Sequence, residues 1–348
     1  MAVKKSAEKP AVSFDRVSIV FGNKPETALP MMDEGRAREE IQQATGQILG
    51  VHDCSVDVAH GEIVVLMGLS GSGKSTLLRA VNGLNPVVRG NVTVRDGDWA
   101  CDPASCSAHD LRRLRRECVS MVFQQFGLLP WRTVVENVAF GLELAGMSAK
   151  ERRDKAMAQL ELVNLQAWAE RKVQELSGGM QQRVGLARAF ATEAPILLMD
   201  EPFSALDPLI RNHLQDELLD LQTRLNRTIV FVSHDLDEAV KLGSRIAIME
   251  GGRIIQIGTA QEIILKPANT YVADFVAHMN PLNVLRARDV MRKTRAAKAK
   301  EGSVSVDAET SLREVFAKAR KANGPLSVVS RGRAIGEIDH KTLVEALG

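Results

Sequence analysis

A glycine-rich loop set between two apolar segments constrains the fold of this chain more than any other feature. Residues 68–76 read GLSGSGKST and match the pattern G-x-x-x-x-G-K-[ST]. An apolar run at 63–67 leads into the loop, and apolar residues at helical spacing follow it. A strand, a tight loop and a helix N-terminus in this order aim backbone N–H groups and the positive end of a helix dipole at one point. The loop therefore predicts an α/β core with a site for a polyphosphate.

The residues of this loop predict how a nucleotide would be held. Glycines let the backbone approach the phosphates closely. Lys74 is expected to reach the β and γ oxygens, and the Ser75 hydroxyl to supply a hard oxygen ligand for Mg²⁺. A chance glycine loop is the alternative, which the flanking strand and helix disfavour. The residues expected to contact the phosphates of ATP are Gly68, Ser70, Gly71, Ser72, Gly73, Lys74, Ser75 and Thr76.

Two more apolar runs end in polar residues that suit chemistry on a phosphate. The run 196–199 shows no alternation, which is typical of a parallel strand buried on both faces, and Asp200 and Glu201 follow it. Open α/β sheets bind ligands beyond their strand ends. Asp200 is therefore expected to hold Mg²⁺ through water, and Glu201 to orient or deprotonate an attacking water. The run 228–233 ends at His234, which is expected to contact the γ-phosphate. The alternatives are two surface carboxylates and a structural histidine.

The segment 176–183, LSGGMQQR, lies between these motifs and makes chemical sense only against a second nucleotide. Its Ser177 is also a good helix N-cap, followed by flexible glycines. This local role does not compete with the functional one. The segment therefore predicts a dimer driven by ATP.

Taken in order, these motifs resemble those of an ATP-binding cassette (ABC) ATPase, over most of residues 12–265. The resemblance implies an α/β fold: a RecA-like P-loop ATPase core with an antiparallel β subdomain and a helical signature subdomain at about 126–185. The nucleotide-binding domain is expected to span residues 1–280.

The same resemblance assigns roles to single residues. It implies that Ser177 and Gly179 touch the γ-phosphate held by the opposite subunit, so that two ATP molecules join a head-to-tail homodimer. The Q-loop glutamine matches Gln124, with Gln125 as the alternative, and would link the site to a membrane partner. The implied catalytic residues are Lys74, Gln124, Glu201 and His234. The implied Mg²⁺ ligands are Ser75, Gln124 and Asp200, and further nucleotide contacts are Gly178, Gln181 and Asp207.

An aromatic residue in an early strand normally stacks on adenine in this family. Phe14 and Phe21 are the candidates, and Phe21 is preferred because the glycine after it would turn the chain towards the nucleotide. Stacking would contribute about 1–3 kcal/mol. The alternative is a phenylalanine buried in a strand. An insert at about 23–49 lengthens the usual spacing to the phosphate loop, and residues 33–43 within it are expected to form a charged helix.

A finer resemblance rests on residues 28–35, 68–73 and 205–211, which look like the ATPase subunits of bacterial importers for glycine betaine, proline betaine and choline. Choline is the first choice among these osmoprotectants. Selectivity for a quaternary ammonium group belongs to an aromatic cage, which the resemblance assigns to a separate substrate-binding protein. This chain, with 4% aromatic residues and one Tyr, contains no information on that selectivity. The alternatives are an importer of amino acids or polyamines, or a soluble ABC ATPase outside transport.

Composition is consistent with a cytoplasmic subunit. The 348 residues are 45% hydrophobic, and the formal net charge of +2 gives no indication of a nucleic-acid partner. No apolar run approaches the ~18 residues that a membrane helix needs. A peripheral position at the cytoplasmic face of the inner membrane, beside two membrane permease subunits, is therefore expected. Reduced thiols are expected because no metal spacing or C-x-x-C pair joins Cys54, Cys101, Cys106 and Cys118.

The composition changes after residue 280. Segments at 289–291, 304–307 and 326–338 resemble one cystathionine β-synthase-type (CBS) regulatory module, which predicts a small α+β domain at 281–348. Such modules act in pairs, and there is room for one here. Sensing of ionic strength or of a nucleotide by this module would require pairing between subunits.

Overall fold

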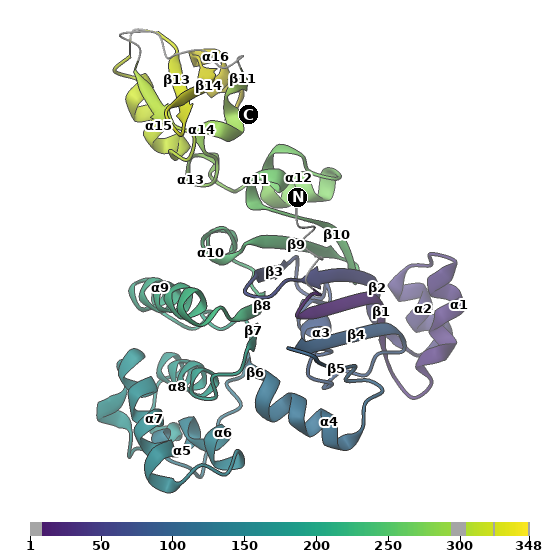
Figure 1. The fold of residues 1–348 in the computed structure, drawn as a ribbon. Coiled ribbons are helices and arrows are strands. Elements are labelled where there is room, and N and C mark those ends of the chain that lie inside the picture. The colour runs from purple at the N-terminus through teal and green to yellow at the C-terminus, as the bar shows by residue number, and fades with distance from the viewer. Residues whose placement is uncertain (1–8, 294–303, 323, 347–348) are drawn as a thin grey trace, which may run out of the picture. The chain divides into compact units, whose positions relative to one another are not determined.

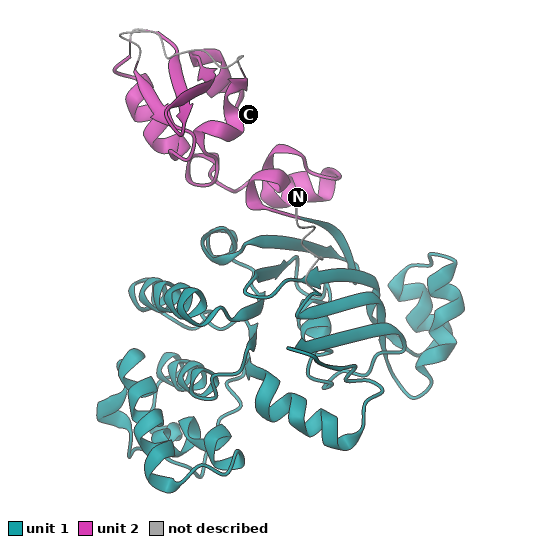
Figure 2. Ribbon diagram, viewed as in Figure 1, with its two compact units in different colours: residues 1–257 teal, residues 258–348 magenta. Residues whose placement is uncertain are grey.

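The computed structural model describes residues 9–293, 304–322 and 324–346. The chain forms two compact units, Met1–Ile257 and Gly258–Gly348 (Figure 2). The first unit thus ends before residue 280, where the sequence places the domain boundary. Residues between the two positions pack with the second unit: Ile264 lies against its apolar core, and Gln261 Nε2 donates to the Val284 carbonyl at 3.1 Å.

The first unit contains a six-stranded sheet in the order β10-β9-β3-β8-β7-β6 (Figure 1). Strands β9, β3, β8, β7 and β6 run parallel, and the central ones are buried along their whole length, which explains why their sequences do not alternate. The strands are β3 (Ile63–Met67), β6 (Val119–Val122), β7 (Ile196–Asp200), β8 (Thr228–Val232), β9 (Arg245–Glu250) and β10 (Arg253–Gly258). Their parallel direction brings the carboxyl ends of β3, β7 and β8 to one edge of the sheet.

A second, antiparallel sheet has the order β2-β1-β4-β5. Its strands are β1 (Val12–Phe21), β2 (Ile48–Val58), β4 (Arg89–Asp96) and β5 (Trp99–Cys101). Strands β4 and β5 form an antiparallel hairpin, in which Asp96 pairs with Trp99. Residues of both sheets and of α3 (Lys74–Leu78) form one apolar core, so the helix that follows the phosphate loop is held between the sheets.

Helices occupy the chain between β6 and β7 and also follow β7 and β8. Those between β6 and β7 are α5 (Val134–Val138), α6 (Phe140–Leu144), α7 (Ala149–Leu162) and α8 (Gly178–Ala191). The others in this unit are α4 (Ala108–Arg113), which continues into a π-helical turn over Leu114–Cys118, then α9 (Pro208–Leu225) and α10 (Leu236–Leu242). The expected core, antiparallel β part and helical part of an ABC ATPase are therefore all present.

The insert between β1 and β2 is folded. It contains a short 3-10 helix (Pro25–Ala28), α1 (Leu29–Asp33) and α2 (Arg38–Thr45). The expectation of one helix over 33–43 is wrong, because α1 ends at Asp33 and Gly35 adopts a left-handed φ of +74°. The chain turns there, and the second helix begins at Arg38.

The second unit has its own four-stranded sheet in the order β11-β14-β13-β12. Its strands are β11 (Arg292–Lys293), β12 (Ser305–Asp307), β13 (Leu326–Ser330) and β14 (Arg333–Ile338). Its helices are α11 (Ala260–Leu265), α12 (Thr270–Val276), α13 (Pro281–Val284), α14 (Ala287–Val290), α15 (Leu312–Ala319) and α16 (His340–Glu345). The unit is thus α+β; its relation to CBS modules stays a prediction.

Candidate functional site

The phosphate loop joins β3 to α3 through backbone that only glycine fits. Gly68 has φ of +143°, and a Cβ there would collide with the Met249 carbonyl oxygen. Gly73 has φ of +97°, and a Cβ there would lie 2.6 Å from the Gly50 carbonyl oxygen. Both positions combine left-handed backbone with close approach of another segment, so a larger side chain would distort the loop.

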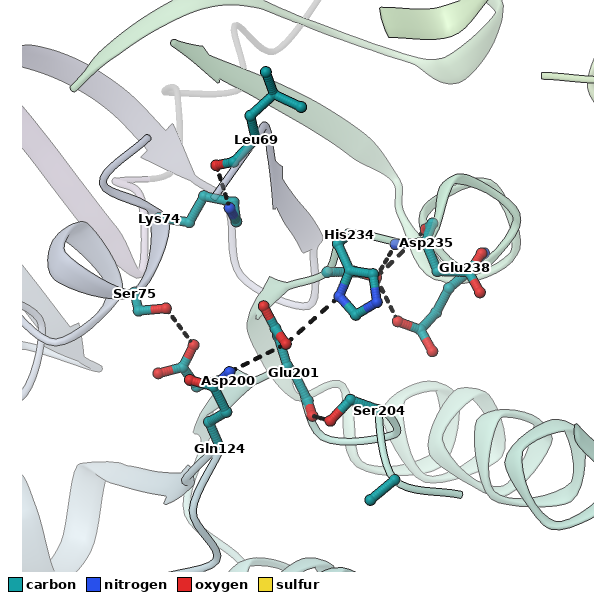
Figure 3. A network of polar contacts seen from close by, with 12 residues as sticks. Leu69, Lys74, Ser75, Gln124, Asp200, Glu201, Ser204, His234, Asp235 and Glu238 are labelled. Carbon is teal, nitrogen blue, oxygen red and sulfur yellow. Dashed lines mark hydrogen bonds and ion pairs between the residues drawn. The ribbon is translucent and has the colours of Figure 1, made fainter. Parts of the chain in front are cut away.

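The side chain of Lys74 is hydrogen-bonded to the backbone of its own loop. Its Nζ donates to the carbonyls of Gly68 at 2.8 Å and Leu69 at 2.9 Å (Figure 3). Burial lowers the pKa of Lys74, and the carboxylates of Glu201 and Asp200 oppose that shift. Ser72 Oγ is buried and has no hydrogen-bond partner among the described residues. A cationic amine and an unpaired hydroxyl within a glycine cradle fit a phosphate group.

Asp200, at the end of β7, faces α3. Its side chain is 0% exposed; Ser75 Oγ donates to Oδ1 at 2.6 Å, and Arg79 Nη2 pairs with Oδ2 at 2.9 Å (Figure 3). The hydroxyl and carboxylate oxygens form a donor set of the kind that Mg²⁺ prefers. Sequence reasoning missed Arg79, although it lies four residues after Ser75 and therefore on the same helix face.

Glu201 lies in contact with two other residues that are predicted to be catalytic, Gln124 and His234. Its Oε2 accepts from Gln124 Nε2 at 3.3 Å and lies 3.5 Å from His234 Nδ1 (Figure 3). Gln124 therefore contacts Glu201 among the described residues, whereas its predicted role was that of a metal ligand beside Asp200. Within the described part of the chain, Gln125, the alternative, makes no side-chain hydrogen bond to Glu201.

The backbone of Glu201 is itself unusual. Its φ of 49° lies in the left-handed region, where a non-glycine residue is held at a cost of about 1–3 kcal/mol. The peptide is fixed by its N–H, which donates to the Val232 carbonyl at 3.1 Å, and by its carbonyl, which accepts from Ser204 Oγ at 3.0 Å. Such strain directs the carboxylate towards Gln124 and His234.

Gln182 is a site residue that sequence reasoning missed. It lies buried on α8, donates from Nε2 to the Glu201 carbonyl at 3.2 Å and accepts at Oε1 from the Ala205 N–H at 3.0 Å. The only signal in the sequence is a glutamine on a helix face that is otherwise apolar. This side chain connects the helix after the LSGG segment to the segment after Glu201.

The remaining predicted residues make local contacts within one copy. Ser177 Oγ caps α8 by accepting from the Met180 N–H at 3.4 Å, and Gln181 Nε2 donates to the Leu176 carbonyl at 3.1 Å. Asp207 Oδ1 caps α9. Within the described residues, none of these hydrogen bonds reaches the phosphate loop of the same chain. The expected contact with a partner's nucleotide stays a prediction.

The two aromatic candidates differ in burial. Phe14 is 2% exposed and belongs to the core. Phe21, at the end of β1, is half-buried, and a Cβ built on Gly50 would lie 2.8 Å from its Cε2 and 3.0 Å from the Thr76 methyl. Phe21 is thus the candidate that lies near Thr76 in the first turn of α3, and its stacking on adenine stays a prediction.

Comparison with known proteins agrees with this geometry. Residues 51–204 match a family model described as ABC transporter. The chain is 51% identical over 275 residues to the glycine betaine/proline betaine transport system ATP-binding protein ProV of Escherichia coli, covering 79% of this chain and 68% of that protein. It is 42% identical over 338 residues to the trimethylamine N-oxide transport system ATP-binding protein TmoW of Ruegeria pomeroyi, covering 97% of each.

Among solved structures, the dimeric bacterial ABC transporter cassette MJ0796 superposes with a TM-score of 0.62 at 30% identity, over 71% of this chain and 98% of that one. The same cassette is known in a post-hydrolysis state bound to ADP and Pi. These matches confirm the resemblance inferred from the motifs. The chain is an ABC-type ATPase and belongs to the family of ABC transporter ATP-binding subunits that includes these betaine and trimethylamine N-oxide transport proteins.

Proposed function

We propose that two copies of this chain close around two ATP molecules and thereby energise an importer of small methylated amines. The observation that carries the proposal is the meeting of Gln124, Glu201 and His234 at the edge of the sheet beside the phosphate loop. These three side chains come from segments far apart in the sequence. A carboxylate between an amide donor and an imidazole suits the positioning of one water molecule against a γ-phosphate.

Each residue then has a defined task in hydrolysis. Lys74 and the loop N–H groups hold the β and γ oxygens, Glu201 orients the attacking water and accepts its proton, and His234 contacts the γ-phosphate. Ser75 and Asp200, with Gln124, would hold Mg²⁺, which supplies positive charge against the phosphate oxygens when bound. Phe21 would stack on the adenine.

The dimer is proposed to place Ser177, Gly178 and Gly179 against the nucleotide of the second copy. Leu209, in the first turn of α9 beside Asp207, is 80% exposed, so a large apolar side chain lies uncovered close to the predicted contact region. Contact with a second copy would bury the Leu209 side chain. The dimeric cassette MJ0796 supports this arrangement.

A membrane partner is proposed to dock beside Gln124. A hollow of about 600 Å³ is lined by Arg79, Leu84, Asn85, Phe123, Gln124, Gln125 and Gly127. Trp131, in the segment after it, is 69% exposed, which favours docking over packing within the helical part. No helix in the described ranges is long and apolar enough to cross a membrane. Two permease subunits and a substrate-binding protein would complete the importer at the cytoplasmic face of the inner membrane.

The transported compound is the finer part of the proposal. Choline, the first choice from the sequence, stays a prediction. The names of the two relatives favour glycine betaine, proline betaine and trimethylamine N-oxide, and the relative matched along 97% of its length belongs to a trimethylamine N-oxide transport system. All of these carry a methylated nitrogen, so one substrate class covers them.

Uptake by cells that lack this subunit tests the proposal. Labelled choline, glycine betaine and trimethylamine N-oxide are supplied to cells carrying either the wild-type chain or Glu201→Gln. We expect uptake of at least one of them with the wild-type chain and none above background with Glu201→Gln. A labelled amino acid and a labelled polyamine serve as controls. Uptake of either control compound, without uptake of any of the three methylated amines, would contradict the proposed substrate class.

A further inference from the structure

We infer that Arg38, in the insert between β1 and β2, is a positioning residue that holds the phosphate loop in the shape that binds ATP. Its Nη1 donates to the Gly71 carbonyl at 2.7 Å, and its Nη2 donates to the Gly50 carbonyl at 2.7 Å. One guanidinium therefore joins the loop to the neighbouring strand β2. The inference rests on the ATP site described above.

The insert packs against the antiparallel sheet and can therefore position this side chain. A small apolar core joins it to the antiparallel sheet, made of Val20, Ala28, Met32, Ile41 and Leu49. Asp33, at the end of α1, pairs with Arg89 of β4 through both carboxylate oxygens, at 2.5 and 3.0 Å. Arg38 is the first residue of α2 and is therefore placed by this docked pair of helices.

The guanidinium lies where three backbone segments approach closely. A Cβ built on Gly252 would be 2.8 Å from Arg38 Nη2 and 3.0 Å from the Gly50 carbonyl oxygen. A Cβ built on Gly73 would be 2.6 Å from the same carbonyl oxygen and 3.5 Å from Gly252 Cα. Arg38 supplies two side-chain hydrogen bonds at this junction, where a Cβ on Gly73 or Gly252 would crowd the neighbouring segments.

The direction of two peptide groups in the loop follows from these contacts. Arg38 holds the Gly71 carbonyl, and the Gly252 N–H holds the Ser72 carbonyl at 3.2 Å. In a trans peptide the carbonyl and the following N–H point in opposite directions. The Gly71–Ser72 peptide is therefore held at both ends, because its carbonyl accepts from Arg38 and its N–H donates to the Leu69 carbonyl at 3.2 Å. The Gly73 N–H points away from the Ser72 carbonyl that Gly252 binds, and we infer that it is offered to the phosphate oxygens.

Loss of Arg38 would leave the Gly71 carbonyl without its donor. The peptide could then rotate and present a carbonyl oxygen to an anion, which repels it. Arg38 also brings positive charge, and its Nε is buried with no partner among the described residues. Burial lowers the pKa of Arg38, but a guanidinium stays charged under any physiological condition.

The test compares ATP affinity and turnover in the full chain. Arg38→Met keeps the apolar stem and removes both donors, and we expect its ATP dissociation constant and its KM to rise about tenfold, while kcat changes less than KM. Arg38→Lys can bond one carbonyl and should recover part of the affinity. Binding is measured with a fluorescent ATP analogue, and the midpoint of thermal unfolding without nucleotide verifies that each variant is folded.

Two control variants distinguish the loss of the Arg38 hydrogen bonds from a general effect of substitutions in or beside the insert. Arg89→Met removes a partly exposed ion pair of the insert but leaves the apolar core that keeps α2 in place, and Arg36→Met removes an exposed arginine of the insert that pairs with Glu34. Both should bind ATP nearly as the wild-type chain does. Unchanged affinity in Arg38→Met, or an equal loss in Arg38→Met and Arg89→Met, would overturn the inference. Absence of ATP binding by the wild-type chain would instead overturn the proposed function.

Discussion

Gln182 and Ala205 are joined by a hydrogen bond of 3.0 Å from the Ala205 N–H to the Gln182 side-chain oxygen. Because the nitrogen of the same amide donates to the Glu201 carbonyl at 3.2 Å, one side chain of α8 holds the backbone at Glu201 and four residues after it. The position of Glu201 therefore depends on helix α8, whose N-terminus is capped by Ser177. In the proposed dimer this helix would carry the contact with the partner's nucleotide, so the contact and the catalytic carboxylate would be mechanically linked.

Replacing Gln182 by Leu should both destabilise the fold and slow hydrolysis. The Ala205 N–H and the Glu201 carbonyl would each lose a hydrogen bond to the Gln182 side chain, and each such bond contributes about 0.5–1.5 kcal/mol to the free energy of unfolding. Urea unfolding measures the stability, and steady-state kinetics measure turnover. Gln182→Glu keeps the acceptor for Ala205 but loses the donor to Glu201, so it should retain more stability than turnover. Wild-type values of both quantities in Gln182→Leu would contradict this linkage.

Glu201→Gln should retain ATP binding and lower turnover roughly 10²- to 10⁴-fold, the usual contribution of a group that positions or deprotonates water. Glu161→Gln, which neutralises an exposed carboxylate on α7, is the matched control and should turn over normally. Binding is followed by fluorescence and turnover by phosphate release. Normal turnover in Glu201→Gln would remove this residue from its role.

Glu238 should make stability depend on pH. Burial and the Asp235 carboxylate raise the pKa of Glu238 above its ordinary 4.5, while hydrogen bonds from Ser233 and Gln215 and the charge of Arg211 oppose the shift. The folded state thus binds this proton more tightly than the unfolded state does. The resulting stability is fully present below pH 4.5 and is lost as the pH rises through the folded pKa.

Glu238→Gln should therefore be more stable than the wild-type chain at pH 8 and should lose less stability between pH 5 and pH 8. Unfolding midpoints in urea at several pH values provide the measurement. A wild-type pH profile in the variant would show that another group is responsible.

The cysteines should react unequally with alkylating reagents. Burial raises the pKa of Cys54 to about 12, and burial together with the neighbouring Cys106 raises the pKa of Cys101 to about 12. Burial likewise raises the pKa of Cys118 to about 11. The thiolate is the reactive form, so iodoacetamide at pH 8 should label the half-buried Cys106 first. Mass spectrometry of the native chain checks the order, and equal labelling of all four would contradict it.

The parts of the site that follow from local spacing were predictable from the sequence. The phosphate loop is a strand, a turn and a helix within about fifteen residues, and Asp200 and His234 follow apolar strands whose direction in a parallel sheet is fixed by the intervening helices. Tertiary packing did not have to be known to place them at one edge. The same holds for the hairpin β4–β5, which an Asp-Gly turn marks.

The supporting contacts could not be predicted because they join segments that are remote in the sequence. Arg79 reaches Asp200 across 121 positions, and Arg38 reaches Gly71 across 33. No periodic pattern encodes which side chain will meet which carbonyl across such distances. The expectation of one helix over 33–43 is wrong for a different reason: the charge pattern continues through Gly35, but the left-handed backbone of Gly35 ends the helix there.

The most direct test of the shared nucleotide site mixes two inactive variants. Lys74→Ala lacks the amine that holds the phosphates, and Ser177→Arg places a bulky side chain where the partner's phosphate is expected. In a mixed dimer, the phosphate loop of the Ser177→Arg copy would face the intact signature segment of the Lys74→Ala copy, which restores one complete site. We predict ATP hydrolysis in the mixture well above the sum of the two variants alone. No gain on mixing, under conditions where the two copies exchange, would contradict a nucleotide held jointly by two chains.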